Sequence, residues 1–187
     1  KARTEQDLAV FDRMLKGNGD LRTGKDYLIP RFHTLPFTKY GAITWKNVNY
    51  LVGLTKPITM THSGTPYDMG PYSIFIPESC IVHGAYEGIH FVPMAPNPDR
   101  RFRHPHHVVD DPSEDGNPLD DRARTCWGSF GPILSLCAKS GDVVEFFRTL
   151  YLYTASYDQH SPLAHAGQQG NGVLAVSHRK EIPRHAR

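Results

Sequence analysis

The sequence predicts a single α+β domain, and three observations support this prediction. The length of 187 residues falls in the range of roughly 100–200 that one hydrophobic core serves. Between residues 40 and 76, β-branched and aromatic segments alternate with turn formers, which is typical of antiparallel strands. Between residues 143 and 157, apolar side chains recur at helical intervals. The 39% hydrophobic and 21% charged content is that of a folded globular protein rather than a disordered chain.

The first predicted element is a helix over residues 5–16. Thr4 and Asp7 have the spacing of a capping box, with aspartate in place of the usual glutamate. The sequence Gly-Asn-Gly at residues 17–19 tolerates the left-handed conformation that ends a helix. Between these signals the apolar residues at helical spacing are Leu8, Phe11, Met14 and Leu15.

An antiparallel meander of three or four strands is predicted to follow. The strand-forming segments are residues 42–45, 49–52, 58–61 and 72–76, each rich in β-branched or aromatic side chains. Pro66 and the pair Gly70 and Pro71 interrupt the pattern before the last strand. Residues 89–92 give one further extended segment. We expect the last predicted helix to pack on one face of this sheet.

Residues 94–124 are predicted to form a long loop without regular secondary structure. Prolines stand at positions 96, 98, 105, 112 and 118, and an acidic run covers residues 110–121. Proline removes a backbone donor and fixes φ, so it interrupts helices and central strands. Loops of this length in compact domains are often functional.

A C-terminal helix is predicted from Val143 to Tyr157. Asp142 stands at the N-cap position, where its carboxylate can accept a bond from the first turn. The apolar stripe consists of Val143, Phe147, Leu150 and Thr154, widened by Val144, Phe146 and Tyr151. Before this helix, residues 131–136 read as a short helical or extended piece, and residues 157–163 end the helix in a turn with a proline. The tyrosines at 151, 153 and 157 indicate amphipathic packing rather than base stacking, since the local charge is not basic.

The charge and hydropathy patterns argue against nucleic-acid and membrane partners. The net charge is +2, and the basic stretch over residues 177–187 is interpreted as a solvated tail. No apolar run approaches the roughly 20 residues that cross a bilayer, and no signal-peptide pattern is present. We therefore expect a cytoplasmic protein or a component of a protein particle. The chain begins at Lys1, which fits either a processed protein or a fragment of a longer product.

Three cysteines without CxxC spacing argue against a disulfide framework and a zinc knuckle. Cys80 and Cys137 lie in apolar surroundings and are predicted to be core residues. Cys126 follows Arg122, Arg124 and Thr125 and precedes Trp127, so it is the candidate reactive thiol.

Three features follow one another in order along the sequence. The first is a turn at His104, Pro105 and His106, and the second is Cys126 before Trp-Gly. The third is a helix that ends at an Asp-containing turn with Pro-Leu at 162–163. This series resembles the core of ubiquitin-conjugating enzymes, especially bacterial and phage members with a His-Pro-His turn. The segment 66–72 before an apolar strand is similar to a strand entry of that fold, and the first helix and meander match its N-terminal layout. The resemblance covers residues 40–163 and leaves 164–187 as a C-terminal extension.

The resemblance implies that Cys126 carries a ubiquitin-like modifier as a thioester, receives it from an activating enzyme and passes it to an amine. His104 and Pro105 would set the turn, His106 would take the oxyanion-side position, and Asp158 would lie near the incoming amine. No metal or organic cofactor is implied. The sequence departs from the family in two ways. His106 stands where the family usually has asparagine, and Cys126 lies twenty positions after His106, a longer spacing than is usual in the family.

Two alternatives remain open at the level of sequence. One is a non-catalytic relative that keeps the fold as a binding or assembly module, or a structural component of a larger particle with other protein subunits, because fold does not establish function. The other is a metal site, since imidazole, carboxylate and thiolate are all zinc ligands. The residues available for such a site are His104, His106 and His107 with Asp110, Asp111 or Cys126.

Overall fold

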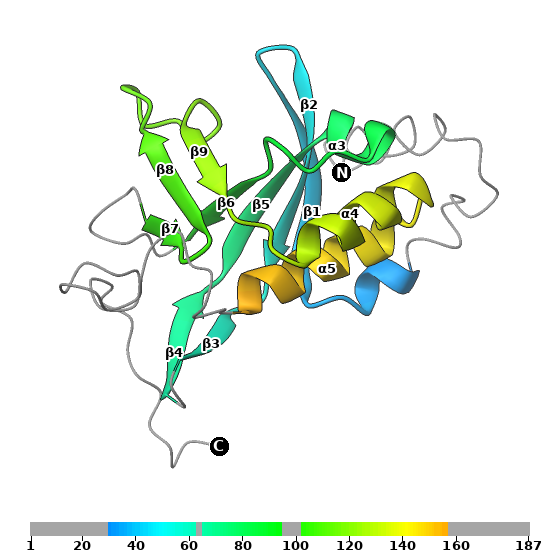
Figure 1. The fold of residues 1–187 in the computed structure, drawn as a ribbon, viewed down its shortest axis with the longest axis horizontal. Helices are drawn as coiled ribbons and strands as arrows, with labels where there is room; N and C mark the ends of the chain where they lie inside the picture. The colour runs from blue at the N-terminus through cyan, green and yellow to red at the C-terminus, as the bar shows by residue number, and fades with distance from the viewer. Residues whose placement is uncertain (1–29, 63–64, 95–101, 157–187) are drawn as a thin grey trace. The chain divides into compact units, whose positions relative to one another are not determined.

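The computed structural model describes residues 30–62, 65–94 and 102–156 (Figure 1). It is a mixed α+β structure with antiparallel sheets, which confirms the predicted fold class. The first predicted helix at 5–16 and the C-terminal extension lie outside the described residues. The chain divides into two compact units. The first contains the described part of Lys1–Thr55 together with Ile74–Ile89 and Ser129–Tyr151. The second contains Lys56–Ser73, His90–Gly128 and the described part of Leu152–Arg187.

The first unit is built on a long hairpin. Strand β1 (Phe37–Trp45) pairs antiparallel with β2 (Val48–Thr55), as Figure 1 shows. The two residues between them, Lys46 and Asn47, have φ values of 44° and 63°, which is the left-handed geometry of a tight hairpin turn. The last residues of β5 (Tyr72–Pro77) lie on the other side of β2. The predicted strands at 42–45 and 49–52 are therefore confirmed as a pair.

Helix α5 (Val143–Ala155) packs on this hairpin, as predicted. Asp142 caps it, since the Glu145 N–H donates to Asp142 Oδ1 at 3.0 Å. The ring of Phe147 lies 5.6 Å from the rings of both Phe37 and Tyr40. Gly53 makes this approach possible, because a Cβ there would stand 2.7 Å from the Phe37 ring. The helix ends at Ala155, before the predicted end at residue 157.

Two shorter helices complete the first unit. Helix α3 (Glu78–His83) follows β5 directly and ends at Gly84, whose φ of 69° permits the left-handed cap. Helix α4 (Phe130–Lys139) contains residues 131–136, which the sequence predicted to be either helical or extended. Leu134 and Cys137 of α4 are buried, whereas Ile133 and Leu136 are exposed. No helix among the described residues is long and apolar enough to span a bilayer.

The expected single meander over residues 42–76 is wrong in one respect. Strand β3 (Ile58–His62) does not extend the β1–β2 sheet but pairs antiparallel with β4 (Thr65–Gly70) in a separate two-stranded sheet. No strand was predicted at 65–70, because Pro66 and Asp68 are poor strand formers. That unexpected strand gives β3 a partner only a few residues away.

The expectation of an irregular loop at 94–124 is also wrong in part. Residues 102–125 contain a three-stranded antiparallel sheet, with β7 (Phe102–His104), β8 (His107–Asp111) and β9 (Arg122–Thr125) in that order. Strand β6 (His90–Pro93) confirms the extended segment predicted at 89–92. The described prolines do not break the ladder, since Pro105 lies in the β7–β8 turn and Pro112 and Pro118 lie between β8 and β9.

Candidate active site

The turn between β7 and β8 is held by the side chain of its first histidine. His104 is fully buried, and its Nδ1 accepts a bond from the His106 N–H at 3.1 Å. The proton of the neutral ring therefore sits on Nε2, which donates to the Thr154 carbonyl at 3.0 Å. Thr154 belongs to the last turn of α5, where helix carbonyls lack intrahelical partners. One neutral imidazole thus shapes the turn and ties it to the end of α5.

Cys126 is attached to this turn through its main chain. The Cys126 N–H donates to the His106 carbonyl at 2.8 Å, directly after the end of β9. The Tyr153 hydroxyl donates to the same His106 carbonyl at 2.9 Å and lies 3.3 Å from the Cys126 carbonyl. The predicted site residues His104, His106 and Cys126 are therefore brought together, although Cys126 lies twenty positions after His106 in the sequence. Asp158, the fourth predicted site residue, lies outside the described residues.

Aromatic rings pack around the turn and the cysteine. The Tyr153 ring stacks on His104 with centroids 5.3 Å apart and planes 27° apart. It also lies 4.9 Å from Trp127 and 5.1 Å from Phe91. The His106 ring is only 5% exposed and lies 6.1 Å from the ring of Tyr153. Trp127 is half-buried, so this cluster reaches the surface beside Cys126.

The three cysteines differ in exposure as predicted. Cys126 is half-buried, whereas Cys80 and Cys137 are buried. Burial raises the pKa of Cys80 to about 12, with a further contribution from the charge of Glu87. Burial also raises the pKa of the Cys137 thiol. Thiolate chemistry at neutral pH is thus disfavoured at both core cysteines, which confirms their interpretation as packing residues.

The basic residues before Cys126 are engaged with the acidic run. Arg124 Nε donates to Asp110 Oδ2 at 2.6 Å, and this pair holds the pKa of the Asp110 carboxyl below its usual value. The neighbouring Thr125 Oγ1 lies 2.8 Å from Nδ1 of His107. The strand that leads into Cys126 is therefore fixed to β8 by side chains as well as by the ladder.

The acidic insertion is ordered around one buried arginine. Arg103 is 8% exposed, pairs with Asp121 and lies 3.5 Å from the Pro118 carbonyl. Asp121 also accepts from the Ser113 N–H at 2.7 Å through its other oxygen. The insertion between the turn and Cys126 is thus anchored at both ends.

Two further histidines, His90 and His107, are buried as neutral rings in the second unit. Burial lowers the pKa of His90 to about 4, and nearby Arg103 lowers it further, against the charge of Asp120. Burial lowers the pKa of His107 well below its usual value, helped by the charge of Arg103. Within the described part of the chain, His90 Nδ1 and His107 Nε2 have no hydrogen-bond partner.

The metal interpretation receives no geometric support from these residues. Both ring nitrogens of His104 are occupied by protein groups, and His107 uses Nδ1 toward Thr125. In residues 30–62, 65–94 and 102–156 no three His, Cys, Asp or Glu side chains are arranged to hold a metal ion.

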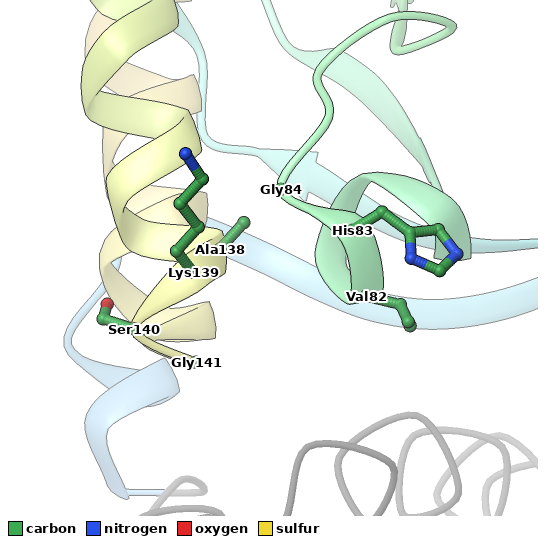
Figure 2. Close-up of a pocket in the computed structure, with 7 residues that line it drawn as sticks. All are labelled: Val82, His83, Gly84, Ala138, Lys139, Ser140 and Gly141. Atoms are coloured by element: carbon green, nitrogen blue, oxygen red, sulfur yellow. The ribbon is translucent and has the colours of Figure 1, made fainter.

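A cavity of ≈ 320 Å³ lies in the first unit, between the C-terminal ends of α3 and α4 (Figure 2). Its lining contains none of the predicted site residues. The Lys139 side chain packs next to Gly84, with its Cγ 3.2 Å from where a Cβ on Gly84 would stand. The His83 ring points away from α4 (Figure 2). These exposed side chains and helix ends form no catalytic constellation.

Comparison with known proteins gives a negative result. No family model, curated protein or solved structure matches this chain.

Sequence reasoning missed Tyr153 as a member of the site. It placed this residue in amphipathic packing, and the 1% exposure of Tyr153 confirms the packing. Its hydroxyl bonds are to main-chain carbonyls 47 and 27 residues away, so no local motif marks them. The only available signal was the polar group itself, because a buried tyrosine hydroxyl usually has a hydrogen-bond partner.

Proposed function

We propose that this protein carries a ubiquitin-like modifier as a thioester on Cys126 and transfers it to an amine, in the manner of ubiquitin-conjugating enzymes. The observation that carries the proposal is the placement of Cys126. It is the half-buried member of the three cysteines, and its main chain is bonded to the His-Pro-His turn. A thioester carrier needs such an accessible sulfur at a fixed position, because the thiolate is the attacking species.

The proposed reaction has two acyl transfers. The Cys126 thiolate attacks the modifier's C-terminal carbonyl carbon, which the activating enzyme presents as a thioester, and the activating enzyme's thiol leaves. An amine nitrogen of the target then attacks the new thioester. An amide bond forms, the amine loses a proton, and the Cys126 sulfur leaves as thiolate. Each step passes through a tetrahedral oxyanion that hydrogen-bond donors stabilise.

His104, His106 and Asp158 take different parts in this proposal. His104 is a structural residue, since both of its ring nitrogens bond to main-chain groups of the turn and of α5. His106 would supply the hydrogen bond to the oxyanion, either directly from its ring or after the turn rearranges when Cys126 is loaded with the modifier. Asp158 would act near the incoming amine.

The test is incubation with ATP, an activating enzyme and candidate modifiers, followed by non-reducing electrophoresis. We expect a band heavier by one modifier that disappears with excess thiol and is absent in Cys126→Ala. Cys126→Ser should give an oxygen ester at a lower level, which survives thiol but not hydroxide. Cys137→Ala is the matched control, since it removes a buried cysteine and should load normally. Loading that persists in Cys126→Ala would contradict the proposal.

A second candidate, a non-catalytic binding or assembly module, is favoured by the burial of the His106 ring. A ring that is 5% exposed among other aromatic groups is placed for packing as well as for donation. The same experiment decides between the two functions, because a module would form no thioester with any modifier.

A further inference from the structure

The last turn of α5 contacts the Cys126 segment through the buried side chain of Tyr153. Tyr153 is 1% exposed, and its hydroxyl lies within hydrogen-bonding distance of two carbonyl oxygens, those of His106 and Cys126. These carbonyls belong to segments separated by twenty residues. The hydroxyl therefore bridges the turn and the cysteine from the side of the helix.

The His106 carbonyl is the point where three segments meet. It accepts from the Cys126 N–H at 2.8 Å and from the Tyr153 hydroxyl at 2.9 Å, which uses both of its lone pairs. Removal of the tyrosine hydroxyl would keep the bond from the Cys126 N–H to the His106 carbonyl and would remove the hydroxyl's contact at 3.3 Å with the Cys126 carbonyl. The main chain at Cys126 would then lose one of its restraints.

The tyrosine ring adds a second restraint next to the thiol. Trp127 directly follows Cys126, and its ring lies 4.9 Å from that of Tyr153. Burial raises the pKa of Tyr153, so the hydroxyl remains a proton donor at all pH values near neutrality. Side chain and main chain around the cysteine are thus held by one residue that does not titrate.

We infer that Tyr153 is the positioning residue of Cys126, fixing the main chain on which the thiol is carried against the His104–His107 turn. The inference deepens the proposed function and rests on it for its catalytic meaning. It concerns orientation, because nothing in the geometry requires the Tyr153 hydroxyl to touch the reacting atoms. The mobility of Cys126 can be measured even if no thioester forms.

The first test is amide hydrogen exchange at Cys126 in Tyr153→Phe, which removes the hydroxyl and keeps the ring. We expect the exchange rate to rise about three- to tenfold, the factor that corresponds to loss of a typical buried hydrogen bond. Tyr72→Phe is the matched control. Tyr72 is also fully buried in the second unit, and its hydroxyl donates to the Arg103 carbonyl at 3.0 Å. An exchange rate within twofold of wild type in Tyr153→Phe would overturn the inference.

The second test separates positioning from general stability. With Cys126 loaded, transfer to excess amine in a single turnover should slow about tenfold in Tyr153→Phe, while the amine concentration that gives half the maximal rate stays unchanged. Tyr72→Phe should transfer at the wild-type rate. A wild-type rate in Tyr153→Phe would overturn the role in transfer. Faster exchange at Cys126 without thioester formation by any variant would support the positioning and remove the proposed function.

A measurement on the unaltered protein keeps the inference testable if Tyr153→Phe does not fold. In the wild-type NMR spectrum the Tyr153 hydroxyl proton should exchange slowly with water and show a nuclear Overhauser contact to the Cys126 amide. A hydroxyl proton that exchanges like that of a free phenol would overturn the inference.

Discussion

Acidification should destabilise this protein through the buried neutral histidines, and His90 permits a quantitative prediction. The His90 ring is 8% exposed, and its Nδ1 lacks a partner among the described residues. Its pKa is lowered to about 4 from the ordinary value of 6.5, mainly by burial. Unfolding exposes the ring to water and restores the ordinary value, so the unfolded chain binds the proton more tightly.

The sign and the size of the effect follow from linkage. Between pH 6.5 and pH 4 the unfolded state carries more protons at this site, so stability rises with pH in that window. The contribution is complete above pH 6.5 and is lost as the pH falls toward 4. One pKa unit corresponds to about 1.36 kcal/mol, which gives a loss of about 2 kcal/mol from pH 7 to pH 5. His107, with its pKa lowered in the same direction, should steepen the dependence.

The perturbation that isolates His90 is replacement with phenylalanine, which has a similar shape and no titrating group. Urea unfolding followed by circular dichroism at pH 7, 6 and 5 measures the free energy of unfolding with few carboxylates titrating. Wild type should lose about 2 kcal/mol more than His90→Phe over this interval. The control is His83→Gln, which removes an exposed histidine at the end of α3 instead of a buried one.

Parallel pH dependences in wild type and His90→Phe would contradict this prediction. Such a result would mean that the folded protein admits the proton at His90 without cost.

Four other predictions follow from the geometry. Gly53→Ala should lower the free energy of unfolding, measured with urea, by about 1–3 kcal/mol because its Cβ would overlap the Phe37 ring. Gly41→Ala, with open space at its Cβ, should unfold with a free energy near that of wild type, and equal free energies for the two variants would contradict this packing. Asp142→Ala should cost about 1 kcal/mol through loss of the α5 cap, and Asp142→Asn should restore most of it; no loss in the alanine variant would argue against the cap. Native Cys126 should react with iodoacetamide before the two buried cysteines, as peptide mapping would show, and equal slow labelling of all three would remove it as the candidate thiol. His106→Ala should slow discharge of loaded Cys126 by ~10²–10³-fold and His106→Asn should recover much of the rate; discharge of the alanine variant at the wild-type rate would exclude His106 as the donor.

The sequence predicted the elements whose side chains repeat with one clear period. Helix α5 and the strands of the β1–β2 hairpin were located within a few residues, because their apolar residues follow periods of 3.6 and 2. Asp142 was identified as a cap from its position alone. Strands β7, β8 and β9 were missed, since the prolines between them suggested an irregular loop and each strand is only three to five residues long.

The site was predictable in its residue types and not in its bonds. His104, His106 and Cys126 were singled out from their order, and the structure brings them together through the main-chain N–H and carbonyl of His106. Tyr153 could not be identified from sequence, because its hydroxyl contacts main-chain oxygens, which every residue carries. Its partners also lie 47 and 27 residues away along the sequence.

The most direct test of the central claim is intact mass spectrometry after reaction with ATP, an activating enzyme and a modifier, with peptide mapping of the product. We expect a single adduct equal to the modifier less one water, attached through a thiol-labile bond to Cys126 and to neither buried cysteine. An unchanged mass with every modifier tried, or an adduct at Cys80 or Cys137, would contradict it.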